Sequence, residues 1–165
     1  MSPFLLAFIA AAALAAPPIA SRVHAPEVEE RLGRLVGDWV IQGLPRTQFR
    51  QKCSWFSAKA FVLCSFDDRR RGITGQAAFG YSALDRRFTY SMLNSTGRSV
   101  RQLGFPSGAY GLVFLDERIE PRGPARIQTS MLVEDDGLRF IEYRSIAGGN
   151  WQQGEHQRHK SNKTQ

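Results

Sequence analysis

Apolar and polar residues alternate along most of the chain between residues 39 and 159, with turn-forming residues about every 8 to 12 positions. This pattern is typical of an all-β sandwich or barrel. The sequence predicts ten strands, at residues 39–42, 47–57, 60–66, 73–81, 86–93, 98–105, 109–116, 125–134, 138–146 and 151–159. Strands joined in sequence order leave two exposed edges unless the sheet closes. We therefore expect an antiparallel up-and-down β-barrel of about ten strands.

Glycine-containing dipeptides mark two of the expected turns. Asp136 and Gly137 form a pair typical of a type I′ hairpin turn, and Gly148 with Gly149 indicates the turn before the last strand. The sequence thus predicts consecutive hairpins at the end of the chain.

A short amphipathic helix is expected ahead of the strands, beginning at Pro26 and ending near Gly37. Its apolar stripe follows the i, i+4, i+7, i+8 spacing and consists of Val28, Leu32, Leu35 and Val36. Because so short a helix is unstable alone, it should cap one end of the barrel. The alternative is a loosely attached terminal segment.

The N-terminal residues resemble an export signal. Residues 4–16 are thirteen almost unbroken apolar residues, which Pro17 and Pro18 interrupt. A membrane-spanning helix needs about 20 apolar residues, whereas the core of a signal peptide needs roughly 7 to 15. We expect a signal peptide within residues 1–25, cleaved somewhere between 15 and 25, and one domain with a short polar C-terminal tail at 26–165. An uncleaved membrane anchor is the alternative.

The two cysteines provide a separate indication of export. If Ala58 and Lys59 form the tip of a two-residue hairpin turn, Cys53 lies directly opposite Cys64. Facing residues of an antiparallel pair are close enough for a disulfide. We therefore predict a Cys53–Cys64 disulfide, which an oxidising periplasmic or extracellular compartment would maintain.

The chain is basic, with a formal net charge of +7. Positive charge favours anionic partners such as lipid head groups, envelope polysaccharides or nucleic acid. Export makes nucleic acid the least available of these, and no nucleic-acid partner is expected. One hypothesis for function is an envelope interaction protein with an inert interior, which would hold an anionic surface through arginines on its outer face: Arg69, Arg70, Arg71, Arg86, Arg87 and Arg101.

Residue patterns for catalysis are absent from the sequence. It contains no Gly-x-Ser-x-Gly elbow and no phosphate-binding glycine motif. The acidic run at 134–136 surrounds a predicted turn, where aspartate is favoured for backbone reasons. The histidines, His24, His156 and His159, lie far in sequence from the cysteines, so no metal site is expected. We expect a non-enzymatic protein without a cofactor, and an enzyme built on the same barrel is a further hypothesis.

Three segments carry a resemblance to a known family. They are residues 32–39 (LGRLVGDW), 75–85 (GQAAFGYSALD) and 88–90 (FTY). Together they resemble the DUF1579 family of lipocalin-like, calycin-type barrels, over about residues 32–159. The resemblance implies an up-and-down barrel with Trp39 packed across its closed end. It supplies no catalytic residues.

The related nitrobindin-like haem barrels differ from this chain. They carry a Gly-x-Gly-x-Tyr-Pro type stretch after the first tryptophan, whereas residues 40–45 here read VIQGLP. They also bind haem through a C-terminal histidine. His156 lies in the last predicted strand, but that strand is polar and basic. Haem is therefore not expected.

The inward face of the barrel is the predicted functional surface. Several strands place aromatic and apolar residues at one parity, which puts them on one face of the sheet. Ten strands leave more interior space than eight, so we expect a cavity that binds a small apolar or amphipathic molecule. A fully packed interior is the alternative. The candidate ligand-binding residues are Trp39, Trp55, Phe79, Tyr81, Tyr90, Met92, Tyr110, Phe114 and Phe140.

Overall fold

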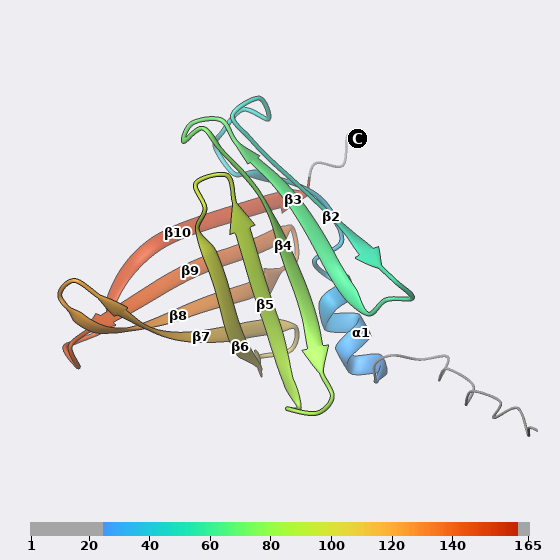
Figure 1. Ribbon diagram of the computed structural model, residues 1–165. Coiled ribbons are helices and arrows are strands. Elements are labelled where there is room, and N and C mark those ends of the chain that lie inside the picture. Colours follow the sequence, from blue (N-terminus) through green and yellow to red (C-terminus); the bar gives the residue numbers. More distant parts are fainter. Residues whose placement is uncertain (1–24, 162–165) are drawn as a thin grey trace, which may run out of the picture.

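The computed structural model describes residues 25–161 as a closed ten-stranded antiparallel barrel preceded by one helix (Figure 1). This confirms the predicted fold class. The helix is α1 (Pro26–Gly33), and the strands are β1 (Gly37–Ile41), β2 (Phe49–Phe56), β3 (Phe61–Asp68), β4 (Ile73–Ser82), β5 (Arg87–Asn94), β6 (Ser99–Ser107), β7 (Gly111–Glu120), β8 (Gly123–Glu134), β9 (Gly137–Ile146) and β10 (Gln152–Ser161).

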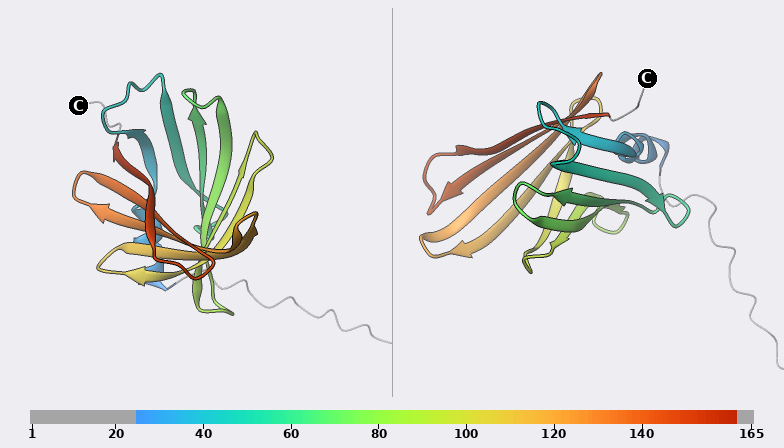
Figure 2. Two further views of the ribbon diagram at one scale, coloured as in Figure 1. Left: turned by 90° about the vertical axis from the view of Figure 1, so that its left-hand side faces the viewer. Right: turned by 90° about the horizontal axis from the view of Figure 1, so that it is seen from above.

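Consecutive strands are neighbours all the way round the barrel, and β1 pairs with β10 to close it. The closing ladder is short, with residue pairs Trp39↔Ser161, Val40↔Lys160 and Ile41↔His159. In β10 the pairing with β9 shifts between Gln153 and His156, as at a β-bulge. The left view of Figure 2 looks into the resulting ring of strands.

Helix α1 covers one end of the barrel, as predicted. Val28 and Leu32 are buried in the same cluster as the side chains at that end of the strands. The helix is shorter than expected, because it ends at Gly33 and the chain then turns with a Leu35 N–H to Leu32 carbonyl bond. This turn still buries Leu35, but it leaves Val36 37% exposed. The fourth residue of the predicted stripe is therefore outside both the helix and the core.

Trp39 lies at this closed end. Its side chain is buried, and its indole Nε1 donates a hydrogen bond to the Leu35 carbonyl at 2.8 Å. A buried indole N–H needs such a partner. The bond therefore ties the start of the barrel to the segment that follows α1.

The β2–β3 hairpin has the predicted register. Cys53 pairs with Cys64, and the two residues form a disulfide. The predicted two-residue turn is wrong, because the last strand pair is Phe56↔Phe61 and the loop contains four residues, 57–60. Three of them have positive φ. Both loops have the same centre, so the register is unchanged.

The β8–β9 turn also differs from the expected one. Asp135 and Asp136 form its tip, whereas Gly137 is the first residue of β9 and pairs with Glu134. Gly137 is not among the residues with positive φ. A Cβ at this position would collide with the main-chain carbonyl of His159. The glycine thus allows the close approach of β10 and does not set the turn type.

The N-terminal signal was predicted for residues that lie, except for Ala25, outside the described part of the chain. Within residues 25–161, no helix has the length and apolar character needed to cross a membrane.

Candidate functional site

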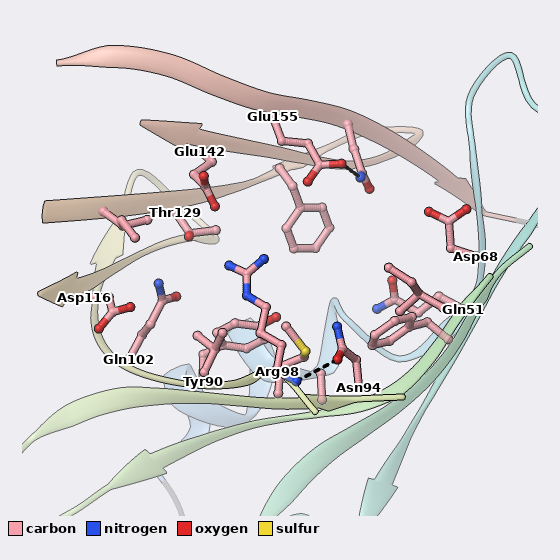
Figure 3. Close-up of a pocket in the computed structure, with 18 of the residues that line it drawn as sticks. Gln51, Asp68, Tyr90, Asn94, Arg98, Gln102, Asp116, Thr129, Glu142 and Glu155 are labelled. Carbon is pink, nitrogen blue, oxygen red and sulfur yellow. Dashed lines mark hydrogen bonds between the residues drawn. The ribbon is translucent and has the colours of Figure 1, made fainter. Parts of the chain in front are cut away.

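A cavity of about 250 Å³ lies inside the barrel, beyond the core cluster that α1 covers. Strand β2 shows the order along the interior: Phe49 and Gln51 line the cavity, whereas Cys53 belongs to the core next to the helix. The barrel thus has a packed end and a hollow end. The hollow end is the candidate site (Figure 3).

Aromatic and apolar side chains form the inner part of the cavity. The Phe79 and Tyr90 rings lie 4.9 Å apart, and both contact the Phe114 ring in the core, at 6.0 and 5.6 Å. Four of the predicted ligand-binding residues line the cavity: Phe79, Tyr90, Met92 and Phe140.

The other five predicted residues do not line it. Trp39 and Phe114 are buried in the core cluster, and Trp55 and Tyr81 pack against that cluster at the closed end. Tyr110 lies in the turn before β7, where Arg34 stacks on its ring at 4.2 Å. The four core residues do face the interior, as their parity predicted. They fill the space next to α1, and residues further along the strands line the cavity.

Polar and charged side chains make up the rest of the cavity wall, and the sequence-based prediction did not include them. A signal for them was present, because the inward parity of Phe114 continues to Asp116 and Arg118, and that of Phe140 continues to Glu142. The polar residues that line the cavity are Gln51, Asp68, Arg71, Asn94, Arg98, Gln102, Asp116, Arg118, Thr129, Glu142, Glu155, Gln157 and His159.

A chain of hydrogen bonds holds His159 in place. Arg71 pairs with the Glu155 carboxylate at 2.5 Å, the amide nitrogen of Gln157 donates to the same carboxylate, and the Gln157 amide oxygen lies 2.9 Å from His159 Nε2. Because an amide oxygen only accepts, Nε2 carries the proton and Nδ1 is an acceptor. Nδ1 is buried and has no hydrogen-bond partner among the described residues.

The surroundings of His159 favour its neutral form. Its ring lies between those of Phe49 and Phe140, with centroids 5.2 and 4.8 Å away, and the residue is 3% exposed. Burial lowers its pKa to about 4, although the Glu155 carboxylate acts in the opposite direction. His159 is therefore a neutral acceptor at pH 7. His156, the histidine considered in the comparison with haem barrels, is exposed.

Two charged groups in the cavity make no ion pair or side-chain hydrogen bond among the described residues: Arg98 and Asp116. The other lining arginines do, since Arg71 pairs with Glu155 and Arg118 pairs with Glu120 at 2.9 Å. Figure 3 shows the Arg98 guanidinium reaching into the cavity above Tyr90.

Two further groups beneath Arg98 complete this wall. Gln102 is 4% exposed, and its buried amide oxygen has no partner among the described residues. Burial raises the pKa of Tyr90 to about 12, with Arg98 lowering it and Glu142 raising it. Tyr90 therefore remains a neutral phenol at any physiological pH, and both charged residues lie near enough to act on it.

The predicted arginine-rich outer face is divided in the structure. Arg71 lines the cavity, so its assignment to the outer face is wrong. Arg69 and Arg70 pair with Asp67 and Asp68 at 3.1 and 2.9 Å, which offsets their charge. Among the remaining residues of the set, Arg87 stacks on the exposed Phe105 ring at 4.7 Å, and Arg86 and Arg101 are exposed.

Residues 25–161 contain no group of three or more histidine, cysteine, aspartate or glutamate side chains placed to hold a metal ion. Comparison of the sequence with protein-family models and with curated proteins found no match. The resemblance to DUF1579 barrels therefore stays a prediction.

Proposed function

We propose that this protein is an exported, non-enzymatic binding protein that holds one small amphipathic molecule inside its barrel. The observation that carries the proposal is the composition of the cavity wall, which combines aromatic side chains with polar atoms that are buried without a partner among the described residues. An apolar pocket with a few convergent polar groups is the usual composition of a small-molecule site.

The size of the cavity limits the ligand. A volume of about 250 Å³ is close to the lower end of the range for small-molecule pockets, which is roughly 300 to 1,000 Å³. We therefore expect a small ligand.

The polar atoms indicate why a wholly apolar ligand is unsuitable. The Gln102 amide oxygen and His159 Nδ1 are buried without a partner in the described part of the chain, and an unsatisfied buried polar group costs about 1 to 3 kcal/mol. A hydrocarbon that displaced water from these atoms would leave both of them without a hydrogen-bond partner. A ligand with a polar group beside its apolar body avoids that cost.

The proposed location is the periplasm or the extracellular space. The Cys53–Cys64 disulfide supports this, because disulfides persist mainly in oxidising compartments.

A dye-binding experiment tests the proposal. We expect 1-anilinonaphthalene-8-sulfonate, a small amphipathic dye, to become fluorescent when it enters the cavity of the full chain. Thr129 lines the cavity, whereas its neighbour Gln128 lies on the opposite face of β8. The substitution Thr129→Trp should fill the cavity and remove most of the dye signal, and Gln128→Trp should retain it.

Circular dichroism and the unfolding midpoint would show that both variants are folded. If the folded Thr129→Trp variant binds the dye as well as the Gln128→Trp variant does, the dye binds elsewhere and the cavity is not the binding site. If the cavity does bind the dye, native mass spectrometry of protein purified from its own source would identify the natural ligand by its mass.

A further inference from the structure

The charges that line the cavity are almost all compensated by neighbours. Arg71 pairs with Glu155, Arg118 pairs with Glu120, and the Arg144 guanidinium lies 3.9 Å from the Glu142 carboxylate. The Asp68 carboxylate pairs with the Arg70 guanidinium at 2.9 Å. Among residues 25–161, one positive and one negative group of the cavity remain without an ion pair, and the ligand should complement both.

Arg98 is the uncompensated positive group. It lies in the β5–β6 turn, where its main-chain N–H donates to the Asn94 side chain at 3.0 Å and fixes the residue at the edge of the cavity. Its guanidinium points into the cavity in Figure 3. A guanidinium presents paired donors that match the two oxygens of a carboxylate.

Asp116 is the uncompensated negative group. It lies on β7 beside Gln102 of β6 in Figure 3, and these two residues offer a carboxylate and a buried amide oxygen that no described residue binds. Both groups are acceptors, so they require hydrogen-bond donors from whatever fills the space between them. An ammonium group supplies three such donors and the matching charge.

We propose that the ligand is a small zwitterion with an apolar body, whose anionic group pairs with Arg98 and whose ammonium group binds Asp116 and Gln102. This inference rests on the proposed function and specifies the head group of the ligand. The apolar body lies on the aromatic rings of Phe79, Tyr90 and Phe140.

Charge balance distinguishes a zwitterion from a singly charged ligand. An anion alone would pair with Arg98 but would leave Asp116 without a partner in a space from which water has been displaced. A cation alone would pair with Asp116 but would forgo the ion pair with Arg98, which is an exposed residue and would stay in contact with water. An unpaired desolvated charge costs more than the mean hydrogen bond contributes, and a missing charge-assisted pair also lowers affinity, so each singly charged ligand binds less tightly.

Three probes with the same phenyl ring separate these cases: phenylalanine, 3-phenylpropionate, which lacks the amine, and 2-phenylethylamine, which lacks the carboxylate. Their dissociation constants for the full chain would be measured by titration calorimetry or by NMR shifts of the labelled protein. We expect phenylalanine to bind at least tenfold more tightly than either singly charged probe.

Substitutions assign each charge to its residue. Arg98→Gln should weaken the binding of phenylalanine and 3-phenylpropionate about tenfold without weakening that of 2-phenylethylamine. Asp116→Asn should have the reverse selectivity, weakening phenylalanine and 2-phenylethylamine only. Arg101→Gln on β6 and Glu117→Gln on β7 are the controls, because both residues are exposed and do not line the cavity, and neither substitution should change any of the three affinities.

Equal affinities for the three probes, no binding of any of them, or loss of affinity in the control variants would overturn the zwitterion inference. If Thr129→Trp loses the dye signal and Gln128→Trp keeps it, the cavity does bind the dye, and only the head group has been misassigned. If the two variants bind the dye equally well, the proposed function fails together with the zwitterion inference.

Discussion

Acidification should destabilise the fold through His159. Between pH 7 and pH 4.5, the free energy of unfolding should fall by about 2 kcal/mol because of this one side chain. The cause is its position between the Phe49 and Phe140 rings, where the charged form of the imidazole is poorly solvated.

The sign and size follow from two pKa values. The ordinary pKa is 6.5, and burial lowers that of His159 to about 4 in the folded chain. The unfolded chain therefore takes up a proton below pH 6.5 while the folded chain does not. The contribution of His159 to the free energy of unfolding is fully present well above pH 6.5 and is lost as the pH falls toward 4. The full difference of roughly 2.5 pH units corresponds to about 3 kcal/mol, at about 1.36 kcal/mol for each.

Urea unfolding followed by tryptophan fluorescence from pH 4.5 to 7 measures this effect. The parent protein and a His156→Gln control should lose about 2 kcal/mol over the range, whereas His159→Gln should lose less by about that amount. The His156 side chain is exposed on the same strand and serves as the matched control. Should His159→Gln fail to fold, NMR titration of the parent gives the answer directly. An imidazole at position 159 that titrates near pH 6.5 would refute the reasoning.

Three further predictions concern the disulfide, the closed end and the contact between β9 and β10. Reduction of the Cys53–Cys64 bond should lower the free energy of unfolding by roughly 3 kcal/mol, and neither cysteine should be alkylated before reduction. Trp39→Ala should cost about 3 to 5 kcal/mol, while Trp39→Phe, which loses the bond to Leu35, should cost less; equal effects would show that the ring does not fill the closed end. Gly137→Ala should cost about 1 to 3 kcal/mol because the added methyl meets the His159 carbonyl, whereas Gly154→Ala meets only ordinary contacts. Urea unfolding of each pair is the measurement.

The strands were predictable because alternation records which residues face inward, whatever lies inside. Thus Phe79, Tyr90 and Phe140 were assigned to the correct face from parity alone. The depth of a residue along the barrel is not recorded in parity. Trp55 and Tyr81 share the inward parity but pack near α1, and the cavity begins only beyond them.

The polar part of the site was harder to predict for two reasons. Asp116 and Glu142 continue apolar inward series, but a charged residue at such a position also fits a strand that is simply leaving the core. Arg98 was expected to be the first residue of a strand but lies in the turn before β6, so its parity with Val100 and Gln102 did not by itself place its side chain. Its main-chain N–H is bound by the Asn94 side chain, a contact of that turn which periodicity does not predict.

The pairing of β1 with β10 has a consequence for the order of folding. All other neighbours in the barrel are consecutive strands, which assemble as local hairpins, but this ladder joins opposite ends of the described chain through only three residue pairs. Contacts between distant residues form late, because the entropy of closing the loop must be met first. His159 lies in that ladder, opposite Ile41. We therefore expect the wall that carries His159 to form late in folding. A ligand that contacts both this wall and β5 would then stabilise the closed form of the barrel.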